Sequence, residues 1–556
     1  MTTIVALLSS LVAPGQPPVP SPARADVVLV GGKIWTGEKD RPQVQSLAVW
    51  NDRILQVGTD AELTPLIGPK TQVIQLKGKR VVPGFHDSHL HFLSGGQQLS
   101  QVDLKDAGDE AEFGRRLQEF DKKTPRDRWL LGGNWDHDRT FNGVLPTAAV
   151  VDKYVKDRPV FIRRYDGHMA LANSAALKLA GVTAETKEVP GGVIYRLADG
   201  KTPSGILKDN SMSLVNRLIP APGEEEMSEA ALAALRALAE SGITSAQDMS
   251  GSRELLRILQ RLTRTGRMTA RLDLHWPGGG RQELTRLGVE DNFGNAYLRL
   301  GGIKFFVDGS LGSSTAKMFA PFVGEPKNTG VYVTEPDALK AMVRQADRAG
   351  LSVSTHAIGD QANAVLLDIY EQVARENGPR DRRFTIEHVQ HLRPQDYQRF
   401  KELSVVASMQ PYHVIDDGRW AEGRIGKERC ASSYAYRSLL DAGAVLAFGS
   451  DWPVAPLSVM EGIDAAVNRR TLDGKHPTGW FPEQAITVEQ ALRAYTWGSA
   501  YGAYQDTDRG TLRPGKFADL VVLSRDILDA AERNNIATTQ VDLTLVGGKV
   551  VFERRN

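Results

Sequence analysis

The sequence contains a single cysteine, no apolar run long enough to span a membrane and almost no net charge. The lone Cys430 excludes an internal disulfide and any zinc site built from several thiolates. The 68 basic residues balance 67 acidic ones, so the net charge of +1 gives no field that would favour nucleic acid or an anionic membrane. Nucleic acid is therefore not expected as a partner, and a metal ion would have to be bound by His, Asp, Glu or modified Lys.

The first 25 residues differ in character from the rest of the chain. Residues 4–13 form an apolar run that is too short for a membrane span, and a proline-rich stretch follows it. Ala23-Arg24-Ala25 then offers a small-x-small cleavage site, so residues 1–25 are predicted to be a signal peptide of a periplasmic or secreted protein. No basic residue precedes the apolar run, and a disordered tail on a cytoplasmic protein explains the same composition.

Both ends of the remaining chain consist of short strand-like pieces separated by turns. DVVLVGGKIWTG and SLAVWNDRILQVG stand near the start, and KFADLVVLS and DLTLVGGKVVFE near the end. We therefore predict one composite β-sandwich domain assembled from residues 26–82 and 505–556.

The long middle part, residues 83–504, alternates strand-like and helix-like segments, which favours a parallel α/β fold. Eight apolar runs are candidate strands: 81–85, 242–249, 270–276, 300–307, 351–357, 383–389, 405–411 and 445–451. This count predicts a (β/α)8 TIM barrel. Residues from about 95 to 225 do not follow this alternation of strands and helices, and we interpret them as a large insertion after the first barrel strand. Because loops at that edge of a barrel build the active site, the insertion is a candidate lid or substrate wall.

Polar residues recur near the ends of the predicted strands. His89 and His91 stand two residues apart in PGFHDSHLHF, which on an extended strand turns both imidazoles to one side. His356, His388 and Asp451 close the fifth, sixth and eighth strands. Each alone is explained by a hydrogen-bonded core histidine or a helix-capping aspartate. In a barrel, however, the strand ends converge, so the five are expected to meet in space.

A lysine lies within the apolar run of the fourth strand, LGGIKFFV. An ammonium is strongly hydrated and is almost never fully buried without a partner, so Lys304 calls for an explanation. One explanation is that the Lys304 side chain extends past the end of the strand and pairs with Asp308.

These motifs together resemble the amidohydrolase superfamily, and more narrowly its YtcJ-like, amidohydrolase-3 branch, which includes N-substituted formamide deformylases. PGFHDSHLH, GGIKFFVDGSLGS, THAIGD, IEHVQH, GSDWP and GTLRPGKFADLVVL carry the resemblance, which covers about residues 26–556. It implies a metal-dependent barrel hydrolase with one or two divalent ions, of which zinc is expected. Carried over residue by residue, it implies a metal site made of His89, His91, Lys304, His356, His388 and Asp451. Lys304 would then be carboxylated, because burial favours the neutral amine, which reacts with carbon dioxide.

The predicted reaction is hydrolysis of a non-peptide carbon–nitrogen bond in a small amide, formamide or cyclic amide. A metal-activated hydroxide would attack the carbonyl, with Asp451 as general acid and base. His413 and His168 are candidates for stabilising the oxyanion, since each lies where a loop could face the barrel mouth. The oligomeric state stays open, a homo-oligomer included.

Other functions remain on the sequence alone, deamination of a nucleobase being a lesser one because AIGD after His356 lacks a glutamate. The same ligand set would serve a lactonase or a phosphotriesterase-like esterase. A non-catalytic binding protein on a relict barrel is the third reading, but its hallmark would be missing ligands, and none of the expected ligands is missing.

Overall fold

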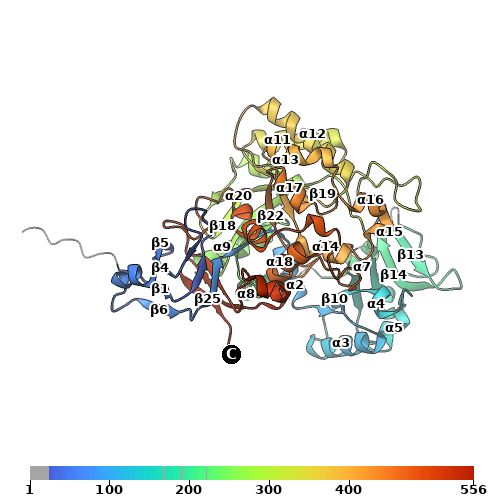
Figure 1. The fold of residues 1–556 in the computed structure, drawn as a ribbon. Coiled ribbons are helices and arrows are strands. Elements are labelled where there is room, and N and C mark those ends of the chain that lie inside the picture. The colour runs from blue at the N-terminus through green and yellow to red at the C-terminus, as the bar shows by residue number, and fades with distance from the viewer. Residues whose placement is uncertain (1–23, 166, 168, 190–191, 221, 556) are drawn as a thin grey trace, which may run out of the picture.

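The computed structural model describes residues 24–165, 167, 169–189, 192–220 and 222–555. In these residues the chain forms a central barrel, two sheets at one side and a further sheet at the other (Figure 1). Residues 1–23 lie outside the described part, so the predicted leader and export remain predictions. No helix of the described ranges is both long enough and apolar enough to cross a bilayer.

Eight parallel strands form a nearly closed barrel, as the strand count predicted. In spatial order they are β8 (Phe85–Leu90), β15 (Ile243–Asp248), β16 (Arg271–Pro277), β18 (Leu298–Phe306), β19 (Ser352–Ala357), β20 (Thr385–His388), β21 (Val406–Met409) and β22 (Val445–Phe448). Two backbone hydrogen bonds connect the end of β8 to the residues that follow β22, and so join the first barrel strand to the last. Asp451 N–H donates to the His89 carbonyl at 2.7 Å, and His91 N–H donates to the Trp452 carbonyl at 2.8 Å.

The first barrel strand lies later in the chain than its apolar pattern predicted. The apolar part of residues 81–85 belongs mainly to β7 (Arg80–Pro83), which pairs with strands of a terminal sheet, and β8 begins at Phe85. Gly84 separates the two strands, and a Cβ there would lie 2.2 Å from the Thr244 hydroxyl oxygen. The prediction was wrong because the barrel strand itself is rich in polar residues, HDSH, while the preceding strand is apolar.

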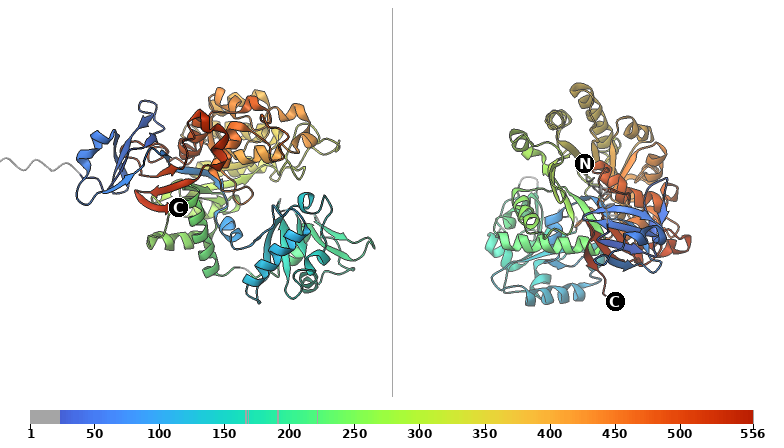
Figure 2. Two further views of the ribbon diagram at one scale, coloured as in Figure 1. Left: turned by 60° about the horizontal axis from the view of Figure 1, so that its bottom comes forward. Right: turned by 90° about the vertical axis from the view of Figure 1, so that its left-hand side faces the viewer.

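Helices cover the outside of the barrel (Figure 2). The main ones are α2 (Phe92–Gln98), α8 (Glu224–Glu240), α9 (Arg253–Arg264), α11 (Pro336–Arg348), α12 (Asp360–Asn377), α13 (Tyr397–Glu402), α14 (Pro411–Asp417), α17 (Tyr436–Asp441), α18 (Val459–Asn468), α19 (Val488–Arg493) and α20 (Ser499–Gly502). In α9 the buried residues are Leu255, Ile258, Leu259 and Leu262, a spacing that places one apolar stripe against the barrel.

Strands from the two ends of the chain share a sheet. The six-stranded sheet has the order β25 (Lys549–Glu553), β24 (Val541–Val546), β23 (Leu520–Leu523), β7, β2 (Lys33–Trp35) and β3 (Gln43–Val44). A four-stranded sheet has the order β5 (Arg53–Gly58), β4 (Ser46–Trp50), β1 (Val27–Val30) and β6 (Gln72–Gln75). One apolar cluster contains side chains of both, among them Leu47 and Leu520. The detailed composite β-sandwich stays a prediction.

Between α2 and α8 the chain builds a separate six-stranded sheet, in the region predicted as an insertion. Its order is β13 (Gly192–Arg196), β14 (Pro203–Asp209), β12 (Met169–Ala172), β11 (Val160–Arg164), β10 (Leu130–Trp135) and β9 (Val102–Asp103), and its longest helix is α3 (Glu110–Lys123). This part has its own apolar clusters and lies beside the barrel (Figure 2, left).

Candidate metal centre

The residues predicted to bind metal come together at the carboxyl ends of the barrel strands. They are His89 in β8, His91 directly after it, Lys304 in β18, His356 in β19, His388 in β20 and Asp451 three residues beyond β22. The ring centroid of His388 lies 4.8 Å from that of His89 and 4.5 Å from that of His356. Residues spread over about 360 positions of sequence therefore converge, as a barrel requires.

Asp451 lies between the imidazoles of the first strand. Its Oδ1 is 3.4 Å from His89 Nε2 and 3.3 Å from His91 Nε2. Ligand atoms of these three residues all lie within 4.8 Å of one another. Oδ1 is buried and accepts no hydrogen bond, although a buried carboxylate oxygen normally has a partner. A divalent cation would satisfy this oxygen and both ring nitrogens.

Hydrogen bonds on the far sides of the rings fix which nitrogens face the centre. His89 Nδ1 lies 2.7 Å from Oε2 of Glu387, and His388 Nδ1 lies 2.8 Å from Oε1 of Gln410. Both Nε2 atoms are thereby left for a ligand, the arrangement typical of metal-binding histidines. His356 differs, because its Nε2 lies 3.0 Å from the Gly309 carbonyl and its Nδ1 is the available atom.

Burial sets the protonation of these groups. It lowers the pKa of His89 and His388 far below the ordinary value and that of His356 to about 4, with the Lys304 ammonium adding to the effect at His89 and His356. Neutral imidazole is the form that binds metal ions. Burial opposes ionisation of Asp451, but the neighbouring imidazoles, chiefly His89, hold its pKa well below the usual range.

Lys304 is 2% exposed and lies inside the site. Burial lowers its pKa to about 8, while Glu387 and Asp451 act in the opposite direction. The pairing with Asp308 considered above is not found. Asp308 instead accepts three backbone N–H bonds, from Lys317 at 2.8 Å, Ile358 at 3.0 Å and Gly359 at 2.9 Å.

Two buried carboxylates near the site were not predicted from the sequence. Glu387 is fully buried, and Asp87 accepts from His89 N–H at 3.0 Å and Ser450 N–H at 3.1 Å, which ties β8 to the end of β22. Glu387 directly precedes His388 in IEH, and an acidic residue inside an apolar strand was the available signal.

A pocket of about 310 Å³ opens over these residues. His413, in the first turn of α14, lines it with Nε2 3.9 Å from Asp451 Oδ2, so this candidate does face the centre. Tyr165 of the insertion also lines it, which supports the insertion's contribution to the substrate wall. His168 lies outside the described residues.

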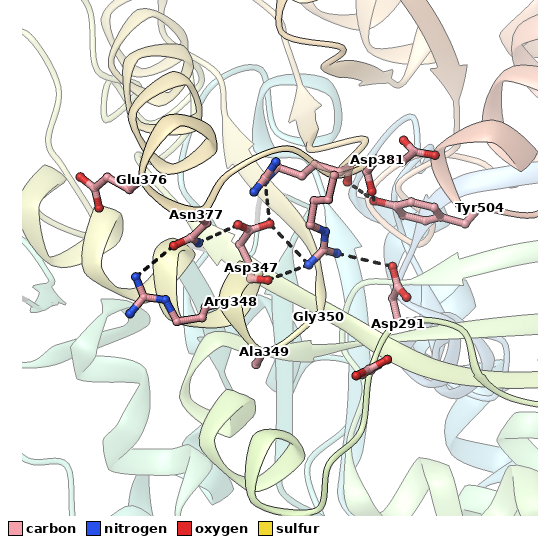
Figure 3. A pocket seen from close by; sticks show the side chains of 12 residues that line it. Asp291, Asp347, Arg348, Ala349, Gly350, Glu376, Asn377, Asp381 and Tyr504 are labelled. Atoms are coloured by element: carbon pink, nitrogen blue, oxygen red, sulfur yellow. Dashed lines mark hydrogen bonds and ion pairs between the residues drawn. The ribbon is translucent and has the colours of Figure 1, made fainter.

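Figure 3 shows a second, wider hollow, where α11 passes into β19 at the amino end of the barrel strands. Asp347 there accepts from Asn377 Nδ2 at 2.7 Å and from Arg382 Nε at 3.0 Å, and Asp291 forms an ion pair with Arg380 at 3.8 Å. Active sites of such barrels lie at the opposite end. We therefore interpret this hollow as a structural ion-pair network.

The barrel and its cluster of histidine and aspartate side chains are the features of a metal-dependent barrel hydrolase. The model of the amidohydrolase family, Amidohydro_3, matches residues 72–552, and the chain belongs to that family. It is thus a hydrolase of carbon–nitrogen bonds other than peptide bonds.

Relatives match almost the whole chain. Protein LONG AFTER FAR-RED 3 of Arabidopsis thaliana is 38% identical, over 95% of this chain and 92% of its own length. Putative amidohydrolase YtcJ of Bacillus subtilis is 29% identical, over 94% and 99%. The N-substituted formamide deformylase of Arthrobacter pascens is 27% identical, over 95% and 98%. An uncharacterised metal-dependent hydrolase of Pyrococcus horikoshii has a similar structure, with a TM-score of 0.75, 30% identity and coverage of 91% and 99%.

Proposed function

We propose that this protein hydrolyses an amide-type bond, in an amide, formamide or cyclic amide, with Asp451 moving the proton. The observation that carries the proposal is the buried Oδ1 of Asp451, which lies without a hydrogen-bond partner between two imidazole nitrogens. A relative of nearly the same length is named for deformylation of N-substituted formamides, which supports this bond type.

The residues that would hold one or two divalent ions are His89, His91, Lys304, His356, His388 and Asp451. The donor set of nitrogen and oxygen suits Zn²⁺, and the fixed imidazoles support it. A bound divalent ion lowers the pKa of water and polarises a carbonyl.

Asp451 is the group of this chain that moves a proton. Its Oδ2 faces His413 and the pocket, at 3.9 Å from Nε2. During attack the carboxylate accepts a proton from the nucleophilic water, and it returns that proton to the leaving nitrogen. His413 Nε2 is buried without a partner, so a protonated Nε2 would donate to the oxygen of the tetrahedral intermediate.

Lys304 would serve as an anionic ligand after carboxylation. The neutral amine adds to carbon dioxide, a C–N bond forms, and one proton leaves to give a carbamate. The lowered pKa supports this step, because about a tenth of an amine with pKa 8 is neutral at pH 7.

The test is turnover of paired substrates. Purified protein would be assayed on N-alkylformamides, N-acylamines and a six-membered lactam, each beside the lactone or ester of the same shape, before and after chelation. We expect nitrogen-containing members to be cleaved faster and chelation to abolish turnover. A clear preference for the lactones or esters would instead establish the esterase alternative.

A further inference from the structure

The pocket over the metal centre has an uneven distribution of charge. Its apolar walls come mainly from Phe306, Leu311, Ile358 and Trp420. Among the described lining residues, Lys304 is the one Lys or Arg, and it lies in the centre itself. Two carboxylates outside that centre, Asp416 and Asp417 of α14, also line the pocket.

The two carboxylates are not equivalent. Asp416 forms an ion pair with Arg419, which does not line the pocket. Asp417 Oδ2 accepts a hydrogen bond from the Tyr434 hydroxyl at 2.5 Å, and no Lys or Arg nitrogen of the described chain forms an ion pair with it. Burial raises the pKa of Asp417 to about 7 and the Asp416 carboxylate adds to this effect, while the Tyr434 hydroxyl and Arg419 act in the opposite direction.

Helix α14 fixes how far Asp417 lies from the reacting centre. His413 and Asp417 are four residues apart on this helix, so they share one face and are separated by about 6 Å along its axis. Of these two residues, His413 is the one near Asp451, with Nε2 3.9 Å from Oδ2. A substrate whose amide lies at the centre would therefore bring a group about five methylenes away close to Asp417.

This arrangement penalises an anionic substrate. A carboxylate at the far end would lose hydration beside Asp416 and Asp417, and the nearby Arg419 is already paired with Asp416. An N–H donor would instead gain a charge-assisted hydrogen bond. Substrates with a carboxylate about five methylenes from the amide are thereby disfavoured.

On the basis of the function proposed above, we propose that Asp417 determines specificity. The substrate is an amide with an apolar body and no carboxylate at its far end, which carries an ammonium or another N–H donor that binds Asp417.

The test uses three N-formyl compounds that differ at one end only. Each has a formamide, five methylenes and then a methyl, an ammonium or a carboxylate group. We expect kcat/KM to be at least 10-fold higher for the ammonium compound than for the carboxylate compound, chiefly through KM. Asp417→Asn keeps an acceptor for Tyr434 and should reduce this ratio at least 10-fold, whereas Asp441→Asn, on the exposed end of α17, should not change it.

Calorimetric binding of the same three compounds separates this proposal from the proposed function. If no compound is hydrolysed but the ammonium compound binds at least 10-fold tighter than the carboxylate compound in an Asp417-dependent way, the hydrolysis of formamides fails and the specificity proposal stands. Equal affinities, tighter binding of the carboxylate compound, or no binding of any of the three would overturn the specificity proposal. A ratio unaltered by Asp417→Asn would overturn it as well.

Discussion

Each ring nitrogen of His89 faces a different carboxylate: Nδ1 lies 2.7 Å from Oε2 of Glu387, and Nε2 lies 3.4 Å from Oδ1 of Asp451. Glu387 is fully buried and has no access to solvent. The proton of the neutral ring is therefore held on Nδ1, and the lone pair of Nε2 is directed at the metal centre.

Replacement of Glu387 should weaken metal binding. Glu387→Gln removes the charge that favours the Nδ1–H tautomer, and we expect about a 10- to 100-fold loss of metal affinity, the usual effect of losing such a partner. Competition with a chromophoric chelator measures it. Glu376→Gln, the same change on the exposed end of α12, is the control. An unaltered affinity in Glu387→Gln would show that Glu387 only fills space.

Lys304→Ala should lose metal and activity together. We expect at least about a 100-fold fall in kcat, comparable with loss of a group that stabilises the transition state, and a lower metal content by elemental analysis. Added short carboxylic acids should restore part of the activity, because they replace the carbamate oxygens. Lys317→Ala is the control, since Lys317 Nζ bonds to Thr329 at 3.0 Å and does not line the pocket. Full metal content and normal turnover in Lys304→Ala would contradict the carbamate.

Asp451→Asn should reduce kcat by about 100-fold or more, because a positioned acid–base group contributes about 10² to 10⁴ in rate. The amide cannot accept the proton of the attacking water at neutral pH. Steady-state kinetics on the best substrate, with metal content measured in parallel, tests this. Turnover near that of the wild type in the metal-loaded variant would exclude Asp451 as the base.

Acid should destabilise the protein through its buried histidines. Burial lowers the pKa of His391 to about 3, and its Nδ1 lies 2.7 Å from the Ser433 hydroxyl. The pKa of His391 is lower in the folded than in the unfolded chain, so the unfolded chain binds a proton first as the pH falls. The stability contributed by the neutral ring is therefore fully present above pH 6.5 and is lost as the pH drops towards 3. His391→Asn keeps a polar partner for Ser433 but does not titrate. Urea unfolding at pH 7, 5.5 and 4 should therefore show a smaller acid loss in the variant, and parallel curves would refute this.

Asp87→Ala should destabilise the barrel, because two buried N–H groups, of His89 and Ser450, lose their acceptor. Each unpaired group costs about 1–3 kcal/mol. Urea denaturation measures the loss. Ser88→Ala, which removes one side-chain bond to Ser408 at 2.9 Å, should cost about 1 kcal/mol. Equal losses in both variants would argue against a special role for Asp87.

The sequence predicted the barrel and the convergence of its histidines because strand ends of a barrel meet whatever their separation in the chain. His89 and Asp451 could be brought together on that rule alone. Glu387 could not be assigned, since its effect depends on which ring nitrogen it reaches, and that follows from side-chain rotamers. The start of β8 was misplaced because its polar residues, His86 to His89, hide the apolar pattern of a strand.

The bonds that join β8 to Asp451 and Trp452 also bear on synthesis of the chain. At about 5–20 residues per second, translation from residue 90 to residue 451 takes about 20 to 70 s. Throughout that time β8 has an unpaired edge, the feature that invites pairing with other chains. We therefore expect chaperones to bind nascent chains shorter than about 450 residues. Once Asp451 has been synthesised, the edge of β8 can pair and the last metal ligand is present, so the need for a chaperone should end when metal can bind.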